Sequence, residues 1–224
     1  DLLYPVIKGA ADIAPCCFNP NHELYAIVPN RGITPAYFAE TQNVMVQENP
    51  RLFEYFHHFE RQLRNRSTYK TRMPTAPYYA IYNVGGYTFA PWKVVWPEQP
   101  GNSGLPVAVV NTRTLRGIGE RLVIPDHKIY FAGFDEASKA FYLCGLLLCS
   151  TVQRFILSFH IMLQVGDIFK HMKLPEYDPT NGQHFLLAKL VKEAHTTTDE
   201  INRQTLLEQI SNIGNSIIEN WNLL

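Results

Sequence analysis

The segment YYAIYNVGGYTFAPWKVVWPE, residues 78–98, has the pattern of two β-strands joined by a tight turn. Its halves, YYAIYNV and YTFAPWKVVW, are rich in β-branched and aromatic residues, which favour strands. Between them, Gly85 and Gly86 can supply the positive φ angles that a two-residue hairpin turn requires. The sequence therefore predicts a central β-hairpin, around which the rest of the chain is organised.

Charge is distributed unevenly around this segment. Lys and Arg total 20 and Asp and Glu total 20, so the net charge of zero indicates no partner. Between residues 61 and 97, however, there is no acidic residue, and the cations there are interspersed with tyrosines and tryptophans. This combination suits a polyanion that carries flat bases, and we expect a nucleic-acid-binding face. The cations are Arg61, Arg64, Arg66, Lys70, Arg72 and Lys93.

The whole chain is predicted to be an α+β protein with two regions. Residues 1–134 are expected to form a mixed, mainly antiparallel sheet that contains the hairpin, and residues 135–224 a helical region packed on it. A helix is expected to begin after Asn49, with Pro50 at its first position, and to run into the basic stretch. The other expected elements are strands at 24–29, 106–111 and 128–134, an exposed loop at 112–122, helices from 135 to 163, and a short strand at 167–177.

The last helix is predicted to be amphipathic. Thr197 and Glu200 have the spacing of a capping box at its start. Such an apolar stripe requires a partner helix, either in this chain or in another copy, so self-association through this helix stays open. The stripe consists of Leu206, Ile210, Ile213, Ile217, Trp221 and Leu224.

The cysteines and the start of the chain bear on its location. Four cysteines occur as an adjacent pair and a helical pair, which is neither a disulfide framework nor a zinc-site spacing, and this favours a reducing cytoplasm. No signal peptide opens the chain. Because the first residue is Asp1 and not Met, we expect a piece of a longer protein.

A membrane span is not expected. Residues 141–163 are long and apolar enough to be considered, but Gln153 and Arg154 lie near their middle. A central arginine costs about 2.5 to 3.5 kcal/mol on insertion scales, so a buried core helix is the preferred interpretation.

Six segments together resemble a known family. In their order along the chain, they resemble the target-recognition (TaqI-like C-terminal specificity) region of adenine-specific DNA methyltransferases and of fused type II restriction enzymes. The segment that holds Phe89, Lys93, Val94 and Trp96 is the most specific of them. The segments are LLYPVIKGAADI, NPRLFEYFHHFERQLRNRS, PYYAIYNVGGYTFAPWKVVW, IPDHKIYFAGF, EASKAFYLCGLLLCS and LPEYDPTNGQHFLLAKL.

The resemblance implies a domain of a bacterial restriction-modification system that selects the methylation target on double-stranded DNA. It also implies that an upstream methyltransferase domain of the same polypeptide binds S-adenosylmethionine, because this sequence contains no Asn-Pro-Pro-Tyr type motif. No catalytic residue, metal or cofactor is therefore expected within this chain, and methyl transfer is not assigned to it alone.

The candidate DNA contacts come from the basic stretch, the predicted hairpin and the predicted loop. Phosphate contact is the functional interpretation of the basic stretch, and a solvated helix end is the alternative. Tyr87 and Trp92 are candidates for stacking on bases, although aromatic residues in a hairpin more often belong to a core. Arg113 and Arg116 are candidates for reading guanine, and a merely solvated loop is the alternative. The complete set is Arg64, Arg66, Tyr69, Lys70, Arg72, Tyr87, Trp92, Lys93, Arg113 and Arg116.

Two other classes of function remain alternatives. A metal-dependent nuclease would use an acid and a lysine two residues apart, such as Asp126 and Lys128, but further acids are missing from the neighbouring sequence. A metal site of His57-His58 with Cys16-Cys17 ranks lower, because adjacent ligands splay apart on a helix. The other alternative is a helical assembly module, whose binding would respond weakly to salt, whereas phosphate binding would respond strongly.

Overall fold

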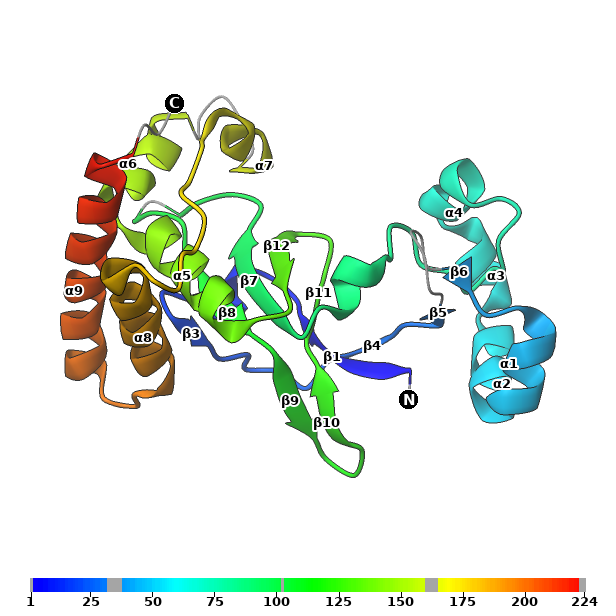
Figure 1. The fold of residues 1–224 in the computed structure, drawn as a ribbon. Coiled ribbons are helices and arrows are strands. Elements are labelled where there is room, and N and C mark those ends of the chain that lie inside the picture. The colour runs from blue at the N-terminus through cyan, green and yellow to red at the C-terminus, as the bar shows by residue number, and fades with distance from the viewer. Residues whose placement is uncertain (1, 32–37, 102, 160–164, 222–224) are drawn as a thin grey trace. The chain divides into compact units, whose positions relative to one another are not determined.

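A computed structural model describes residues 2–31, 38–101, 103–159 and 165–221. It confirms the α+β class, with helices and mixed open sheets. The chain divides into two compact units, one of residues 1–4 and 25–89 and the other of residues 5–24 and 90–224 (Figure 1). The boundary between the compact units thus follows Phe89, inside the segment predicted to be one hairpin, whereas the sequence placed it after Phe134.

The first unit consists of short helices around a tyrosine-rich core. Its elements are β4 (Tyr25–Ile27), β5 (Asn30–Arg31), β6 (Phe38–Ala39), α1 (Gln42–Glu48), α2 (Pro50–His58), α3 (Glu60–Asn65), α4 (Ser67–Arg72) and the 3₁₀ helix η2 (Gly86–Phe89). Phe56 of α2 stacks on Tyr79 with the ring centroids 5.1 Å apart, and Met45 and Tyr69 are buried in the same cluster. Pro50 begins α2 as predicted, but the expected single helix is interrupted at Phe59.

The predicted hairpin at residues 78–98 is wrong. Residues 78–84 form no strand, and the glycine pair leads into η2. Neither Gly85 nor Gly86 has a positive φ angle. Gly85 is needed for space, because a Cβ atom there would lie 2.6 Å from the ring of Tyr87.

Side chains from other segments take the backbone groups that a hairpin would have used. The guanidinium of Arg66 donates hydrogen bonds to the carbonyl oxygens of Tyr78 and Ala80, at 2.6 and 2.9 Å. The side-chain amide of Asn30 donates to the carbonyl oxygen of Ile81 at 2.9 Å and accepts from its N–H at 3.1 Å. Because these buried polar groups are satisfied, the segment is stable as irregular backbone.

The second unit is organised on a three-stranded antiparallel sheet. The strand order is β12 (Ile129–Phe134), β7 (Trp92–Pro97), β8 (Ala108–Val110). Val95 and Ala108 belong to a buried cluster on one side, and Val94 and Trp96 belong to the cluster formed with the helices on the other. Both faces of β7 are therefore covered.

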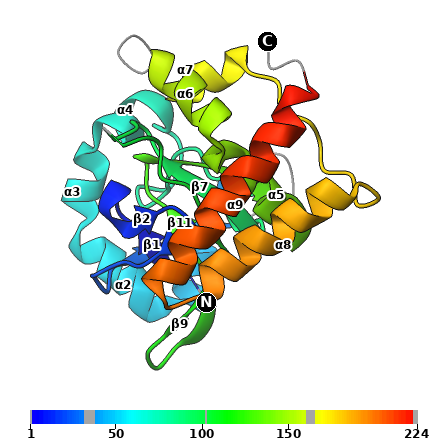
Figure 2. The same cartoon turned by 90° about the vertical axis from the view of Figure 1, so that its left-hand side faces the viewer.

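One helix packs on this sheet, and two further helices pack on that helix. The helical elements are α5 (Ala137–Leu148), α6 (Ser150–Phe159), α7 (Val165–Ile168), the 3₁₀ helix η3 (Phe169–His171), α8 (Gly182–Thr196) and α9 (Glu200–Glu219). Helix α5 packs on the sheet, and α8 and α9 pack on α5 and run beside each other (Figure 2). Ile210 and Ile217 of α9 are buried in this cluster. Ile210 and Ile217 of the predicted apolar stripe thus find partner helices within the chain, whereas Trp221 is exposed and Leu224 lies outside the described residues.

Two predicted details of the helical region are wrong. Residues 167–177 contain no strand: the segment begins at the end of α7, continues as η3 and is irregular from residue 172 to residue 177. The N-cap of α9 is Asp199, whose carboxylate accepts a hydrogen bond from the N–H of Ile201 at 2.9 Å. Thr197 is the C-cap of α8 and forms no capping box.

Residues 112–122 form a β-hairpin in place of the predicted loop. Strands β9 (Thr112–Leu115) and β10 (Gly119–Leu122) pair antiparallel. Gly117 and Gly119 have φ angles of 75° and 94°, the left-handed conformation that glycine adopts without strain. Smaller pairings complete the unit: β1 (Leu3–Ile7) with β11 (Ile124–Pro125), and β2 (Ile13–Ala14) with β3 (Cys17–Phe18), beside the 3₁₀ helix η1 (Ala10–Asp12).

Within the described ranges, no single helix combines the length and apolarity of a membrane span. Helices α5 and α6 meet both criteria only when they are taken together, and they are bent by 64° at their junction. Most of α5 is buried within the second unit, as expected of a core helix.

Candidate nucleic-acid interface

The β9–β10 ribbon carries three arginines in a geometry suited to an anion. Arg113 lies directly opposite Arg121 in the strand register, and paired residues point to the same face of a two-stranded ribbon. Arg116 lies in the turn between the strands. In both views the ribbon projects from the body of the second unit (Figures 1 and 2). The two strands thus present a pair of guanidinium groups on one face and a third at the tip.

Two of the three arginines on this ribbon lack a partner among the described residues, whereas the guanidinium of Arg121 donates a hydrogen bond to the carbonyl oxygen of Glu120 at 2.9 Å. Arg113 and Arg116 form no hydrogen bond or ion pair with any residue that the structure describes. The ribbon's acid, Glu120, points to the opposite face and accepts a hydrogen bond from the hydroxyl of Thr112 at 2.5 Å. Like charges directly opposite each other on two strands are destabilising, so an external anion would relieve this repulsion.

The cations of the first unit divide into paired and unpaired groups. Arg61, Lys70 and Arg72 are exposed and make no hydrogen bond or ion pair within the described part of the chain. Arg64 forms an ion pair with Glu60 at 2.7 Å, and this hydrogen bond lowers the pKa of the Glu60 carboxyl. The exposed unpaired cations are the ones in this unit best suited to phosphate contact.

Two predicted contacts of the first unit point inward. Arg66 donates to the carbonyl oxygen of Leu63 at 2.9 Å as well as to the two carbonyls of the irregular segment, and burial lowers the pKa of its guanidinium. Tyr69 is buried and donates its hydroxyl to the carbonyl oxygen of Ala76 at 2.9 Å. These contacts give both side chains a role in holding the fold, so neither is placed to meet a phosphate in this conformation.

Tyr87, Trp92 and Lys93, the predicted contacts from residues 78–98, differ from one another in burial and in their neighbours. Tyr87 is half exposed, and its hydroxyl donates to the carbonyl oxygen of Asn83 at 2.6 Å. Trp92 packs against Phe141, with the ring centroids 5.7 Å apart. Lys93 is fully buried, and its ammonium donates to the carbonyl oxygen of Ala90 at 2.8 Å. Burial lowers the pKa of Lys93 from its ordinary value of 10.5 to about 8. A surface phosphate contact by Lys93 does not fit this geometry.

Arg121 is the functional candidate that sequence reasoning missed. Its position opposite Arg113 depends on strand pairing, which an interpretation of residues 112–122 as a loop does not contain. The available signal was the alternation of Thr112, Arg113, Thr114 and Leu115 before a glycine-containing turn.

The residues proposed for a nuclease are engaged elsewhere. The carboxylate of Asp126 pairs with the ammonium of Lys8 at 2.6 Å and with His127 at 2.8 Å. Partial burial alone would raise the pKa of Asp126, but these hydrogen bonds hold it at about 2. Asp126 is not part of any group of three metal-binding side chains among the described residues. Among the described residues, Asp126 therefore has no close cluster of further metal ligands of the kind that two-metal chemistry needs.

One cluster of potential metal ligands does lie in the core of the second unit. The ligand atoms of Cys16, Cys144 and His195 all lie within 4.8 Å of one another. However, Nδ1 of His195 bonds to the carbonyl oxygen of Val191 at 2.7 Å, and Nε2 accepts the N–H of Val109 at 2.8 Å. Because both ring nitrogens are engaged, the imidazole has no free lone pair for a metal. The hydrogen bond from Cys144 contributes most to lowering the pKa of Cys16 to about 6.

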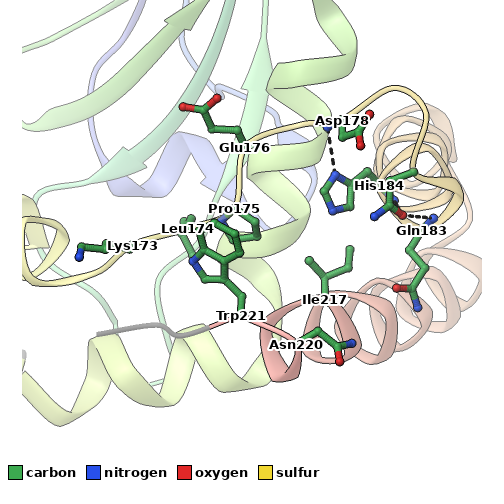
Figure 3. A pocket seen from close by; sticks show the side chains of 11 residues that line it. Lys173, Leu174, Pro175, Glu176, Asp178, Gln183, His184, Ile217, Asn220 and Trp221 are labelled. Atoms are coloured by element: carbon green, nitrogen blue, oxygen red, sulfur yellow. Dashed lines mark hydrogen bonds between the residues drawn. The ribbon is translucent and has the colours of Figure 1, made fainter.

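A cavity of about 690 Å³ lies between α8, α9 and the segment that precedes α8 (Figure 3). His184 is buried in its wall, where Nδ1 accepts the N–H of Asp178 at 3.0 Å and Nε2 bonds to the hydroxyl of Tyr142 at 3.2 Å. Ile217 and Trp221 reach toward it from the end of α9. Since both nitrogens of His184 are used, this histidine fastens α8 to α5 and is not poised for proton transfer.

Comparison with known proteins relates the chain to methyltransferases. No family model matches the sequence. The chain is similar to the Type II methyltransferase M.NspV of Nostoc sp., with 26% identity over 162 residues. The match covers 68% of this chain and 28% of the relative. The similarity supports a methyltransferase-related family, and the chain spans little more than a quarter of the relative's length.

Proposed function

We propose that this chain is the target-recognition part of a type II restriction-modification DNA methyltransferase and that it binds double-stranded DNA in a sequence-specific manner. In this proposal, methyl transfer and S-adenosylmethionine binding belong to another domain of the same polypeptide, which works in a bacterial cytoplasm. The similarity to a type II methyltransferase supports the class of enzyme. The proposal that the chain recognises DNA rests on the β9–β10 ribbon.

The dimensions and the chemistry of the ribbon suit the major groove. That groove is about 12 Å wide and admits a two-stranded β-ribbon. Arginine binds the O6 and N7 atoms of guanine with two hydrogen bonds, which is the commonest specific contact to a base. In our proposal, the face of Arg113 and Arg121 turns toward base edges, and Arg116 at the turn completes the reading element.

The exposed cations of the first unit would supply contacts of another kind. Lys70 and Arg72 on α4, together with Arg61 on α3, would contact phosphates and hold the duplex in register, whereas Arg64 is paired with Glu60. Such contacts contribute affinity without sequence information and weaken as salt increases.

The test is binding of the protein to duplexes with the cognate site and with single substitutions in it. Alanine at Arg113 or Arg116 is expected to cost roughly 1 to 3 kcal/mol for the cognate duplex and to relax preference at one base pair. The matched control is Arg154→Ala, an exposed cation of α6 in the same unit. If both ribbon variants keep the full cognate preference, the ribbon is not the reading element.

A further inference from the structure

The first unit contains a second candidate binding site, a cavity of about 550 Å³ between the end of α4 and residues 80–87. Its volume lies within the range of about 300 to 1,000 Å³ in which proteins hold small ligands. Arg72, Tyr82 and Tyr87 line it together with apolar and uncharged polar side chains, and no carboxylate is among the described lining residues. The cavity therefore offers one uncompensated positive charge beside two aromatic rings.

Hydrogen bonds and close packing fix the walls of this cavity. The two hydrogen bonds between Asn30 and Ile81 hold the floor. The hydroxyl of Tyr87 donates to Asn83, and its ring lies so close over Gly85 that a Cβ atom there would not fit. Asn83 has a φ angle of 61°, a conformation that L-residues adopt rarely and that a defined local structure must hold. The aromatic wall is thus preorganised.

The polar and aromatic groups at the opening are accessible to solvent. Tyr82 and Tyr87 keep 50% and 47% of their surface exposed. Arg72 is exposed and makes no hydrogen bond or ion pair with the described residues. Base-to-aromatic stacking and a guanidinium-to-phosphate contact are the two interactions that such a set provides.

We propose that this cavity binds a nucleobase together with its attached phosphate, with the base against Tyr82 and Tyr87 and the phosphate at Arg72. The same chemistry is presented by a free mononucleotide and by an unpaired nucleotide of a DNA strand. The proposal goes beyond recognition of a duplex by the ribbon and does not depend on it.

Calorimetric titration of the protein with the four deoxynucleoside 5′-monophosphates tests the chemistry. Saturable binding is expected at millimolar or lower concentration, whereas inorganic phosphate, which offers no base, is expected to bind at least tenfold more weakly. Absence of mononucleotide binding at millimolar concentration would overturn the proposal.

A fluorescent base identifies the source of the ligand. Duplexes with 2-aminopurine either paired or left unpaired are titrated with the protein, because stacking quenches this base. A selective quench of the unpaired base would assign the cavity to a strand of DNA, and free mononucleotide binding without that quench would assign it to a soluble nucleotide. If neither probe responds while ordinary duplexes still bind, this inference fails and the proposed function stands.

Two variants locate the site. Arg72→Ala and Tyr87→Leu are each expected to weaken mononucleotide binding roughly tenfold. The matched controls are Arg51→Ala and Tyr55→Leu, which change an exposed cation and a half-exposed tyrosine of α2 that do not line the cavity. Tyr87→Phe, which keeps the ring over Gly85, is expected to retain binding and guards against misfolding. Equal losses in the site and control variants would contradict the assignment.

Discussion

Arg66 in the first unit and Arg113 in the second occupy similar acid-poor sequence but have opposite surroundings. The guanidinium of Arg66 donates hydrogen bonds to three backbone carbonyl oxygens. That of Arg113 has no hydrogen-bond acceptor among the described residues, and Arg113 lies opposite another arginine. The difference teaches that the density of cations along a chain does not identify a nucleic-acid contact. A guanidinium that has hydrogen-bond acceptors within the protein stabilises the fold, whereas one without them is free to bind an external anion.

The largest effect is expected from Arg66→Ala. Two buried carbonyls would lose a charged donor, so the free energy of unfolding of the first unit should fall by about 4 kcal/mol. Urea unfolding followed by circular dichroism measures this, with Arg61→Ala as the exposed control. Equal stability of the two variants would return Arg66 to the candidates for DNA contact.

The second prediction concerns Lys93, a cation that is buried but has no acidic partner. Lys93 is buried without an acid, so Lys93→Met should raise the free energy of unfolding near neutral pH by about 3 kcal/mol, the difference that a lowered pKa of about 8 implies. Because the folded state holds this proton less tightly than the unfolded state, wild-type stability should rise between pH 8 and pH 10.5.

The pH dependence supplies the control for this variant. Urea unfolding of both proteins across that pH interval should show that the contribution from residue 93 is lost in Lys93→Met. A variant that is less stable than wild type at every pH would mean that the ammonium has a compensating partner and that its burial is not costly.

On the ribbon, one substitution should move stability and binding in opposite directions. Arg121→Glu places a carboxylate opposite Arg113, so the free energy of unfolding should rise by roughly 0.5 kcal/mol. At the same time, the affinity for cognate DNA should fall at least tenfold. Thermal unfolding and fluorescence anisotropy measure the two quantities. Arg154→Glu makes the same change in charge on α6 and should leave cognate preference intact. Lower stability together with unchanged DNA affinity would mean that Arg113 and Arg121 neither repel each other nor contact DNA.

The smallest effect is expected from Arg61→Ala. As a proposed phosphate contact, Arg61 should contribute equally to all duplexes and lower the salt dependence of binding by about one in log K against log salt. Binding measured over a series of salt concentrations gives that slope. A change in sequence preference, with the slope unaltered, would mean that Arg61 reads a base.

Several helices and one strand could be predicted from the sequence. The periodicity of residues 137–148, the Asn49-Pro50 start of α2 and the strand at Ile129–Phe134 depend on neighbours within a few positions, and the structure bears them out. Local steric preferences and short-range hydrogen bonds decide these features, and they are the same in any tertiary context.

The hairpin could not be placed by the same reasoning. Residues 78–98 have stronger strand propensity than residues 112–122, yet only residues 92–97 of the first segment form a strand, whereas the second segment forms the hairpin. Asn30, which is 51 positions away, and Arg66 occupy the backbone groups of the first segment. No local sequence pattern indicates that distant side chains bind these backbone groups.

The sequence by itself thus determined the α+β class, most of the helices and the presence of an acid-poor, aromatic-rich stretch. Only the tertiary structure decided which cations face solvent, that Arg113 and Arg121 share one face, and that Cys16, Cys144 and His195 meet in the core. The physical reason is range, because helical periodicity is set within one or two turns, whereas the partner of a guanidinium or a thiol is chosen among groups that come together only when distant segments pack.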